Sequence, residues 1–371
     1  MVPPAPAPRD RPRTPETPAD DGSTPGERPH ESPTGGLHRL RRRRLLGLIV
    51  LAGALLVTIA TSFVLGARPT SPAEVLPVLS TPGATDDISL VVWQLRFPRT
   101  LLALCVGAAL GLAGALIQGH TRNPLADPGI LGISAGASLA VVLGIFILGI
   151  SAPTQYVWLA LAGSAVAAVI VFGASSIGVG SANPMSLILA GAALSAFLVA
   201  MTTAITLADQ SSLDKMRFWA TGSVADRPLS VLWAVLPFLG VGAVIALAST
   251  PAMNALALGE DVATSLGIPV ALTRLLGVLA ITLLAGGATA AAGPIGFVGL
   301  VVPHLARGVT GPDHRWLLPY AGLMGAILVL AADIVGRVVA RPGELQVGIV
   351  LALVGAPFFI ALVRRRKLVS L

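Results

Sequence analysis

The sequence predicts an all-α, polytopic membrane protein with about ten transmembrane helices and an inverted internal repeat. Of its 371 residues, 54% are hydrophobic and only 12% are charged, whereas soluble domains carry about 25% charged residues. The apolar residues gather in runs of about 20, the length that an α-helix needs to cross a hydrocarbon core of about 30 Å. Between residues 45 and 363, twelve basic residues balance twelve acidic ones, so the net charge lies at the two ends of the chain.

Residues 1–44 are expected to form a disordered, Pro- and Arg-rich tail. Ten Pro stand in residues 1–36 and nine Arg in residues 1–44. Such a segment buries too little apolar surface to offset the entropy of its chain. Its last basic residues, at positions 39 and 41–44, directly precede the first apolar run. The positive-inside tendency therefore places the N-terminus in the cytoplasm.

Ten apolar runs follow and predict a transmembrane domain over residues 45–371. The eighth run is short and contains Pro303 and His304, so we expect a broken or tilted helix there. An even number of spans returns the C-terminus to the cytoplasm, as the basic residues 364–367 also indicate. The expected spans are 45–66, 97–118, 128–149, 155–176, 185–207, 229–249, 271–292, 296–311, 317–337 and 345–363.

Two short similarities within the chain predict the repeat. Residues 127–133 resemble residues 293–299, and residues 187–197 loosely resemble residues 347–358. The second and seventh spans are an odd number of spans apart. A duplication of spans two to five onto spans seven to ten is therefore inverted in the membrane, a pattern typical of transporters.

Small residues at helical spacing predict close packing between spans. Gly107 and Gly111 are one helical turn apart in the second span, and Gly132 and Gly136 have the same spacing in the third. Glycines at this spacing let two helix backbones approach closely.

The residue content excludes several classes of function. The net charge of +7 consists of +3 in residues 1–44 and +4 in residues 364–371, so no basic patch of the kind that binds nucleic acid is present. The five His and the single Cys105 show no metal-ligand spacing. Neither Lys215 nor Lys367 ends a phosphate-binding loop. We therefore predict no catalytic residue, no metal site and no cofactor on this chain.

Four arginines lie on the outer face in this topology, where the positive-inside tendency predicts few basic residues. They are Arg96, Arg99, Arg337 and Arg341. Because guanidinium groups bind carboxylates through forked hydrogen bonds, they predict a docking surface for an acidic patch of an external partner. The alternatives are anchoring to lipid phosphates, or pairing with Asp86, Asp87 or Glu344.

The membrane interior is poor in ionisable residues. Asp333 is the only acid clearly within a late span, and Arg337 follows it by one helical turn. This spacing predicts a local ion pair rather than a proton relay. An interior of this kind argues against an ion-coupled secondary transporter.

Residues 251–270 form the longest polar segment between spans on the cytoplasmic side. Glu260 and Asp261 would stand in the first turn of a short helix, where acidic side chains suit the helix dipole. Gly267 fits the end of that helix. An amphipathic helix here could seat in a groove of another protein.

Jointly, these stretches resemble the FecCD family of ABC importer permeases, which take up iron–siderophore complexes, haem and vitamin B12. The resemblance runs in order over roughly residues 45–367. Its motifs are residues 96–101, 118–132, 259–267, 293–304, 313–315, 332–335, 343–348 and 355–358.

The resemblance implies the ten-helix fold of a type II ABC importer permease and a multi-pass protein of the plasma or inner membrane. It implies a second permease subunit, identical or a sister chain, and two cytoplasmic ATP-binding subunits that carry the ATP and Mg. An external solute-binding lipoprotein would deliver a ferric siderophore. Cobalamin or haem imported by the same machinery is one alternative, and an ion-driven secondary transporter is another.

The resemblance also assigns roles to three sets of residues. Arg96, Arg99 and Arg337 match docking arginines, and Arg341 joins them by charge and topology. The segment expected to couple to the ATPase contains Gly259, Glu260, Asp261, Val262, Ala263, Leu266 and Gly267. A helix break on the substrate pathway is expected at Asn123, Pro124, Asp127, Pro128 and Gly129.

Overall fold

A computed structural model describes residues 33–68, 70–81, 86–176 and 184–364. Every regular element within these ranges is helical, which confirms the predicted all-α class. The chain divides into Met1–Arg42 and a compact unit, Arg43–Leu371. Most of the predicted tail lies outside the described residues. Its last part, residues 33–44, is helical and belongs to α1 (Pro33–Val64), so the prediction of disorder was wrong for these residues, whose Leu and Arg have good helix propensity.

Each of the ten predicted spans corresponds to one α-helix of the structure, several of which extend beyond the predicted bounds. Seven helices of the described residues are long and apolar enough to cross a membrane, and α5 and α15 are shorter apolar helices. The ten are α1, α4 (Phe97–Thr121), α5 (Ile133–Leu148), α6 (Pro153–Ser176), α7 (Pro184–Ala208), α9 (Leu229–Ala248), α12 (Val270–Ala292), α13 (Val298–Thr310), α14 (His314–Val339) and α15 (Val347–Arg364).

Helix α13 corresponds to the short eighth span. Its 13 residues extend only about 20 Å at 1.5 Å per residue, so it does not cross the membrane alone. Irregular backbone precedes it, with Gly293 and Phe297 at positive φ angles of 76° and 68°. The span is thus short, as expected, but the irregular backbone lies before the helix, and α13 runs unbroken through Pro303 and His304.

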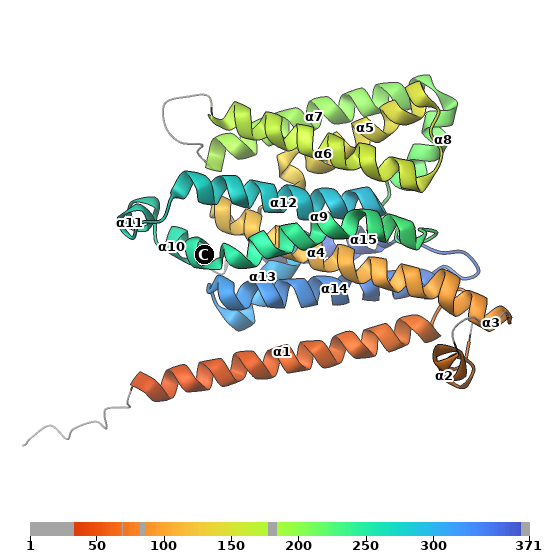
Figure 1. Cartoon of the computed structure of the whole chain (residues 1–371), viewed down its shortest axis with the longest axis horizontal. Helices are drawn as coiled ribbons and strands as arrows, with labels where there is room; N and C mark the ends of the chain where they lie inside the picture. The colour runs from red at the N-terminus through yellow and green to blue at the C-terminus, as the bar shows by residue number, and fades with distance from the viewer. Residues whose placement is uncertain (1–32, 69, 82–85, 177–183, 365–371) are drawn as a thin grey trace, which may run out of the picture. The chain divides into compact units, whose positions relative to one another are not determined.

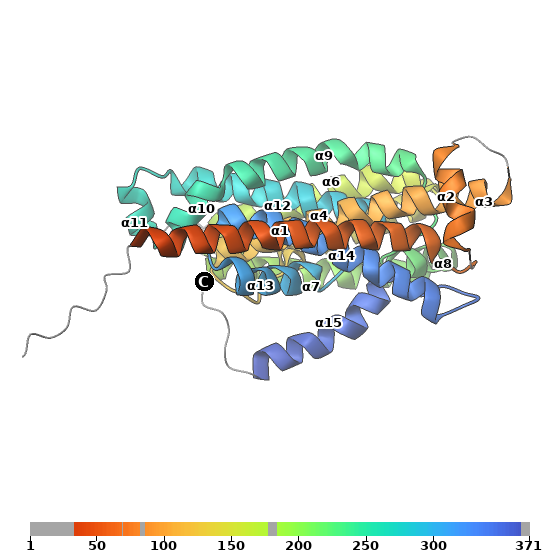
Figure 2. The ribbon, with the colours of Figure 1, turned by 90° about the horizontal axis from the view of Figure 1, so that it is seen from below.

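Short helices connect the long ones at the two ends of the bundle. Figures 1 and 2 show α10 and α11 together at one end and α2, α3 and α8 at the other. We call these the α11 end and the arginine end. The connecting elements are α2 (Pro72–Ser80), α3 (Asp87–Leu90), the π-helix η1 (Val91–Arg96), the 3₁₀ helix η2 (Pro128–Leu131), α8 (Gln210–Trp219), α10 (Thr250–Ala257) and α11 (Glu260–Ser265).

Helices α4 and α12 occupy the centre of the bundle and are the most buried of the seven long helices. Helix α4 packs against α13 and α14, while α12 packs against α5 and α6, and α4 and α12 contact each other. The first half of the predicted repeat is α4 to α7 and the second is α12 to α15. The first helix of each half therefore packs against the second and third helices of the other half. The packing therefore follows the predicted inverted repeat.

Glycines bring the central helices into backbone contact. A Cβ atom on Gly107 would collide with the carbonyl oxygen of Gly325 in α14, and one on Gly111 with that of Ala321. In the same way, Gly136 of α5 lies against the backbone of Gly163 in α6. The predicted close packing is thus present at these three glycines, where a larger side chain would push two helices apart.

Candidate functional sites at the two ends of the bundle

A cavity of about 630 Å³ lies at the arginine end. It contains five guanidinium groups but only two carboxylates, so its lining carries a net charge of +3. The charged residues of the lining are Arg68, Arg96, Arg99, Arg227, Arg337, Asp226 and Glu344. Three of the four arginines predicted from topology therefore share one cavity, which lies between residues far apart in the chain.

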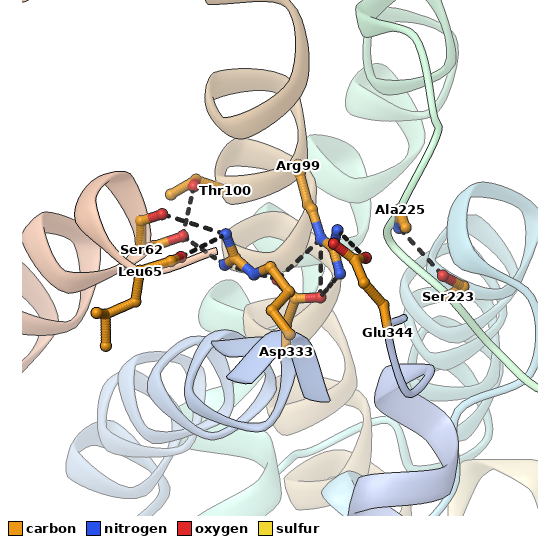
Figure 3. A network of polar contacts seen from close by, with 9 residues as sticks. Ser62, Leu65, Arg99, Thr100, Ser223, Ala225, Asp333 and Glu344 are labelled. Carbon is orange, nitrogen blue, oxygen red and sulfur yellow. Dashed lines mark hydrogen bonds and ion pairs between the residues drawn. The ribbon is translucent and has the colours of Figure 1, made fainter. Parts of the chain in front are cut away.

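Arg99 joins α4 to α14 and to the loop that follows α14. Its Nε and Nη2 atoms donate to Oδ1 of Asp333 at 2.9 and 2.8 Å, and its Nη1 donates to Oε2 of Glu344 at 2.6 Å. Figure 3 shows the Arg99 side chain held between these two acids. The alternative of pairing with Glu344 therefore holds for Arg99. Its side chain retains 12% exposure.

Arg337 is enclosed, with 2% of its surface exposed. Its Nη2 lies 2.8 Å from Oδ2 of Asp333, which confirms the predicted ion pair within α14. Nη2 also donates to Ser62 Oγ at 2.8 Å, and Nη1 donates to the carbonyl oxygens of Ser62 and Leu65 at 3.2 and 3.3 Å. Figure 3 shows Ser62 and Leu65 on the opposite side of Asp333 from Glu344.

Arg96 and Arg341 also bind the end of α1. Arg96 is buried and donates to the carbonyl oxygens of Phe63, Val64 and Arg68. Arg341 donates from Nε and Nη2 to the carbonyl oxygen of Gly66 at 3.1 and 2.7 Å.

Three guanidinium groups thus cap the C-terminus of α1. The last carbonyl groups of a helix lack partners within it and carry partial negative charge. Arg96, Arg337 and Arg341 donate to carbonyls within residues 62–68. The structure therefore gives these arginines a stabilising role inside the chain, and their docking role stays a prediction.

Two further arginines of the cavity lining were not among the four that the sequence analysis selected. Nη1 of Arg68 lies 3.7 Å from Oδ2 of Asp87, and Arg227 lies in the loop between α8 and α9. The Nε atom of Arg227 is buried without a hydrogen-bond partner in the described part of the chain, and burial lowers the pKa of its guanidinium. Counting the predicted spans from a cytoplasmic N-terminus places both residues on the outer face, as it does the other four arginines. The sequence therefore contained a signal for them.

At the α11 end, the predicted short helix is present as α11. Glu260 and Asp261 fall in its first turn, and Gly267 follows it with a φ angle of 79°. Glu260 forms an ion pair with Arg274 of α12. The boundaries expected from the acidic residues and the glycine are therefore confirmed.

Helix α11 is fixed by one apolar side chain and exposes others. Ala263 is fully buried in a small cluster with Met253 and Leu256 of α10. Val262 and Leu266 expose 42% and 62% of their surfaces. A helix that is anchored on one side and exposes apolar side chains on the other is suited to bind in a groove of a partner protein.

Polar contacts tie α10 to the long helices. Asn254 Nδ2 donates to Oδ1 of Asp313 at 2.7 Å, and the backbone NH of His314 donates to Oδ1 of Asn254 at 2.8 Å. Arg122, just after α4, donates from Nη2 to the carbonyl oxygen of Leu256 at 2.9 Å. Helices α10 and α11 are thereby connected to the ends of α4 and α14. The sequence analysis did not identify Asn254, because its partners are remote in the chain.

The predicted helix break between spans two and three is confirmed. Asn123 Oδ1 accepts from the backbone NH of Leu125 at 2.9 Å, and Asp127 Oδ1 accepts from that of Gly129 at 2.8 Å. These turns carry the chain through Pro124 into η2, which begins at Pro128. Pro128 also packs against Gly299 at the start of α13, so the break in the first half contacts the element that follows the break in the second.

Comparison with known proteins gives consistent matches along the chain. The FecCD transport family model matches residues 54–365. The chain is 48% identical to the ferric enterobactin transport system permease protein FepD of Escherichia coli (strain K12), covering 86% of this chain and 94% of that protein. It is 39% identical to the hemin transport system permease protein HmuU of Yersinia pestis, with 76% and 86% covered.

A solved structure supports the same fold. An inward-facing conformation of a metal-chelate type ABC transporter matches with a TM-score of 0.75 and 32% identity. The match covers 86% of this chain and 98% of that one.

Proposed function

The chain belongs to the FecCD transport family, and from that premise we propose that it is the transmembrane permease subunit of an ABC importer for ferric siderophores. The family match over residues 54–365 carries this proposal. The relative FepD, whose name specifies ferric enterobactin, supports the substrate class. The chain is a multi-pass protein of the cell membrane and a transport subunit rather than an enzyme.

The proposed importer contains several further chains. Two cytoplasmic ATP-binding subunits would bind ATP and Mg at the α11 end, and an external solute-binding lipoprotein would dock at the arginine end. This orientation places both termini in the cytoplasm. A second permease, identical or a sister chain, would complete the membrane part. Helix α7 supports a second permease, because only 11% of its most apolar 18-residue stretch is buried within this chain.

For docking, Arg99 is the most suitable of the four predicted arginines. It lies at the cavity with its guanidinium shared between buried Asp333 and partly exposed Glu344. We propose that a carboxylate of the binding protein replaces Glu344 as its partner, because Nη1 of Arg99 would donate to an incoming carboxylate oxygen as it does to Oε2 of Glu344. Arg96, Arg337 and Arg341 would support this site by holding the end of α1 in place.

For coupling, the exposed face of α11 would seat in a groove of the ATP-binding subunit. Closure of the ATPase pair on ATP would displace α10 and α11 together, since Ala263 joins them. Asn254 and Arg122 would pass this displacement to α14 and α4. Coupling of this kind requires two conformations that differ in affinity for nucleotide and for the binding protein.

Uptake into vesicles tests the proposed function. The permease is reconstituted with its ATP-binding subunits, with ATP inside and the loaded binding protein outside. We expect uptake of a labelled ferric siderophore that stops when ATP is replaced by a non-hydrolysable analogue. Uptake driven by an ion gradient without ATP would instead establish the secondary-transporter alternative.

Haem is the second candidate substrate, because the chain is also 39% identical to a hemin permease. Cobalamin remains the third through the family resemblance. The same vesicles, supplied in turn with labelled ferric siderophore, haem and cobalamin on their binding proteins, separate the three. We expect the siderophore alone to accumulate.

A further inference from the structure

A second cavity, of about 410 Å³, lies between α5, α7 and α8. Five hydroxyl side chains line it, and the described residues that form its wall include no charged side chain. We call these five the hydroxyl set: Ser134, Ser138, Ser195, Thr202 and Thr203. The chemistry of this cavity therefore differs entirely from that of the arginine cavity.

The cavity lies where the two halves of the repeat meet. Gly129 of the first helix break and Pro294 of the second both line it. Ser134 Oγ lies 3.3 Å from Thr289 Oγ1 of α12, which belongs to the other half. Ser195 stands near the middle of α7, which spans Pro184–Ala208. The cavity thus extends from mid-height of α7 to α8 at the arginine end, beside the irregular backbone of both halves.

The hydroxyl set is only partly satisfied by the chain itself. Ser138, Thr202 and Thr203 donate to carbonyl oxygens of their own helices and keep lone pairs free. The Oγ atom of Ser195 is buried and has no hydrogen-bond partner in the described residues. A buried polar group without a hydrogen-bond partner is costly. A cavity wall with five hydroxyls is therefore better suited to a polar ligand than to lipid.

We infer that the hydroxyl set is a contact site for the ferric chelate on its way through the membrane. This inference rests on the proposed function. A ferric chelate presents oxygen atoms around its metal, which accept from hydroxyl groups. The buried Oγ of Ser195, which has no partner in the described residues, would become such a donor when the helices around it move during transport. The chelate's own polar hydrogens meet the free lone pairs of Ser138 and Thr202.

The neutrality of this site matters for transport. A buried arginine would hold an anionic chelate strongly, because charge interactions strengthen where water is excluded. A transport pathway needs binding that is favourable enough for entry and weak enough for release. Neutral hydrogen bonds meet both requirements, so the charged groups lie at the arginine end and the hydroxyls lie within the membrane.

Single cysteines test this inference, since the chain has only one native Cys, Cys105. A Cys105→Ala background that retains uptake is combined with Ser195→Cys, Thr203→Cys or, as a control, Val169→Cys. Val169 is an apolar residue of α6 with 71% of its surface exposed. The assembled importer is treated during turnover with a water-soluble methanethiosulfonate, and labelling and siderophore uptake are both measured.

We expect Ser195→Cys and Thr203→Cys to react, and their uptake to fall to the level of vesicles without permease. An excess of unlabelled chelate on its binding protein should slow the labelling, while Val169→Cys should neither react nor lose uptake. The inference is overturned if Ser195→Cys reacts no faster than Val169→Cys, as when a second permease covers the cavity, or if it reacts and uptake continues. Uptake by the unmodified background reports on the proposed function separately, so the two can fail independently.

Discussion

Arg99 and Asp333 lie 234 positions apart in the chain, yet their side chains are joined by short hydrogen bonds of 2.8 and 2.9 Å. The pair fastens the start of α4 to the last turns of α14. Asp333 also pairs with Arg337, so two guanidinium groups share one carboxylate in a largely buried setting. The stability of the arginine end therefore depends on this acid.

Replacing Asp333 with Asn is expected to destabilise the protein by about 3–5 kcal/mol, because it removes the carboxylate that pairs with buried Arg337 and one of the two that pair with Arg99. Denaturant unfolding of the purified protein in detergent measures this change. Glu344→Gln is the matched control, since Glu344 is partly exposed and, in the described part of the chain, forms an ion pair with Arg99 alone, and we expect it to cost about 0–1 kcal/mol. Equal losses for the two variants would contradict the central role of Asp333.

Glu344 and the binding protein are expected to compete for Arg99. Arg99→Gln should weaken the association of the loaded binding protein by about 2–5 kcal/mol, as expected when one partner of a buried charge pair is truncated. Glu344→Gln should strengthen it, because Arg99 is then free to receive the incoming carboxylate. Surface plasmon resonance on the reconstituted permease measures both affinities. If Arg99→Gln binds as tightly as the wild type, docking does not use this arginine.

The ten helices could be predicted because hydrophobic length is a local property of the sequence. The break at residues 123–129 could also be predicted, since Asn123, Pro124, Asp127 and Pro128 direct the backbone through nearby contacts. The boundaries of α11 were predictable from Glu260, Asp261 and Gly267 for the same reason.

The capping of α1 by three arginines could not be predicted. Arg96 and Arg337 contact the same turn of α1, although they follow it in the sequence by about 30 and 275 residues. No local sequence pattern predicts such contacts. Topology indicated that these arginines are unusual but could not distinguish an external acid from the carbonyl groups at the end of a helix. Asn254 was missed for a related reason, since its role depends on hydrogen bonds with Asp313 and His314, which are remote in the sequence.

The exposed apolar face of α11 is expected to bind the ATP-binding subunit. Leu266→Asp should weaken that association by about 1.5–3 kcal/mol, the value of burying a leucine side chain, without affecting membrane insertion. Leu76→Asp is the matched control, because Leu76 is similarly exposed but belongs to α2 at the opposite end. Co-purification and titration of the ATPase subunit measure the effect. A loss of the same size in both variants would indicate a general defect.

Asn254 is expected to transmit displacement of α10 to α14. Asn254→Ala removes its hydrogen bonds to Asp313 and His314, at a cost of about 1–3 kcal/mol in stability. We expect the variant to bind the ATPase subunits and hydrolyse ATP, while siderophore uptake and its dependence on the binding protein are lost. Parallel assays of hydrolysis and uptake in vesicles separate the two. Uptake that stays proportional to hydrolysis would show that Asn254 only stabilises the fold.

Two glycines provide a direct test of close helix packing. A Cβ atom at Gly107 would collide with the backbone of Gly325, which cannot move without displacing α14. Gly107→Ala should therefore destabilise the protein by about 1–3 kcal/mol, as overpacking does. Gly53 of α1 has nothing within 4 Å of the same position, and Gly53→Ala should be neutral or stabilising by about 1 kcal/mol through helix propensity.

Unfolding in detergent measures both glycine variants under one condition. The expected result is a change of opposite sign for the same added methyl group, because only the surroundings of the two glycines differ. If Gly107→Ala were as stable as Gly53→Ala, the contact between α4 and α14 would be looser than the backbone positions require, and the packing at the centre of the bundle would depend on larger side chains instead.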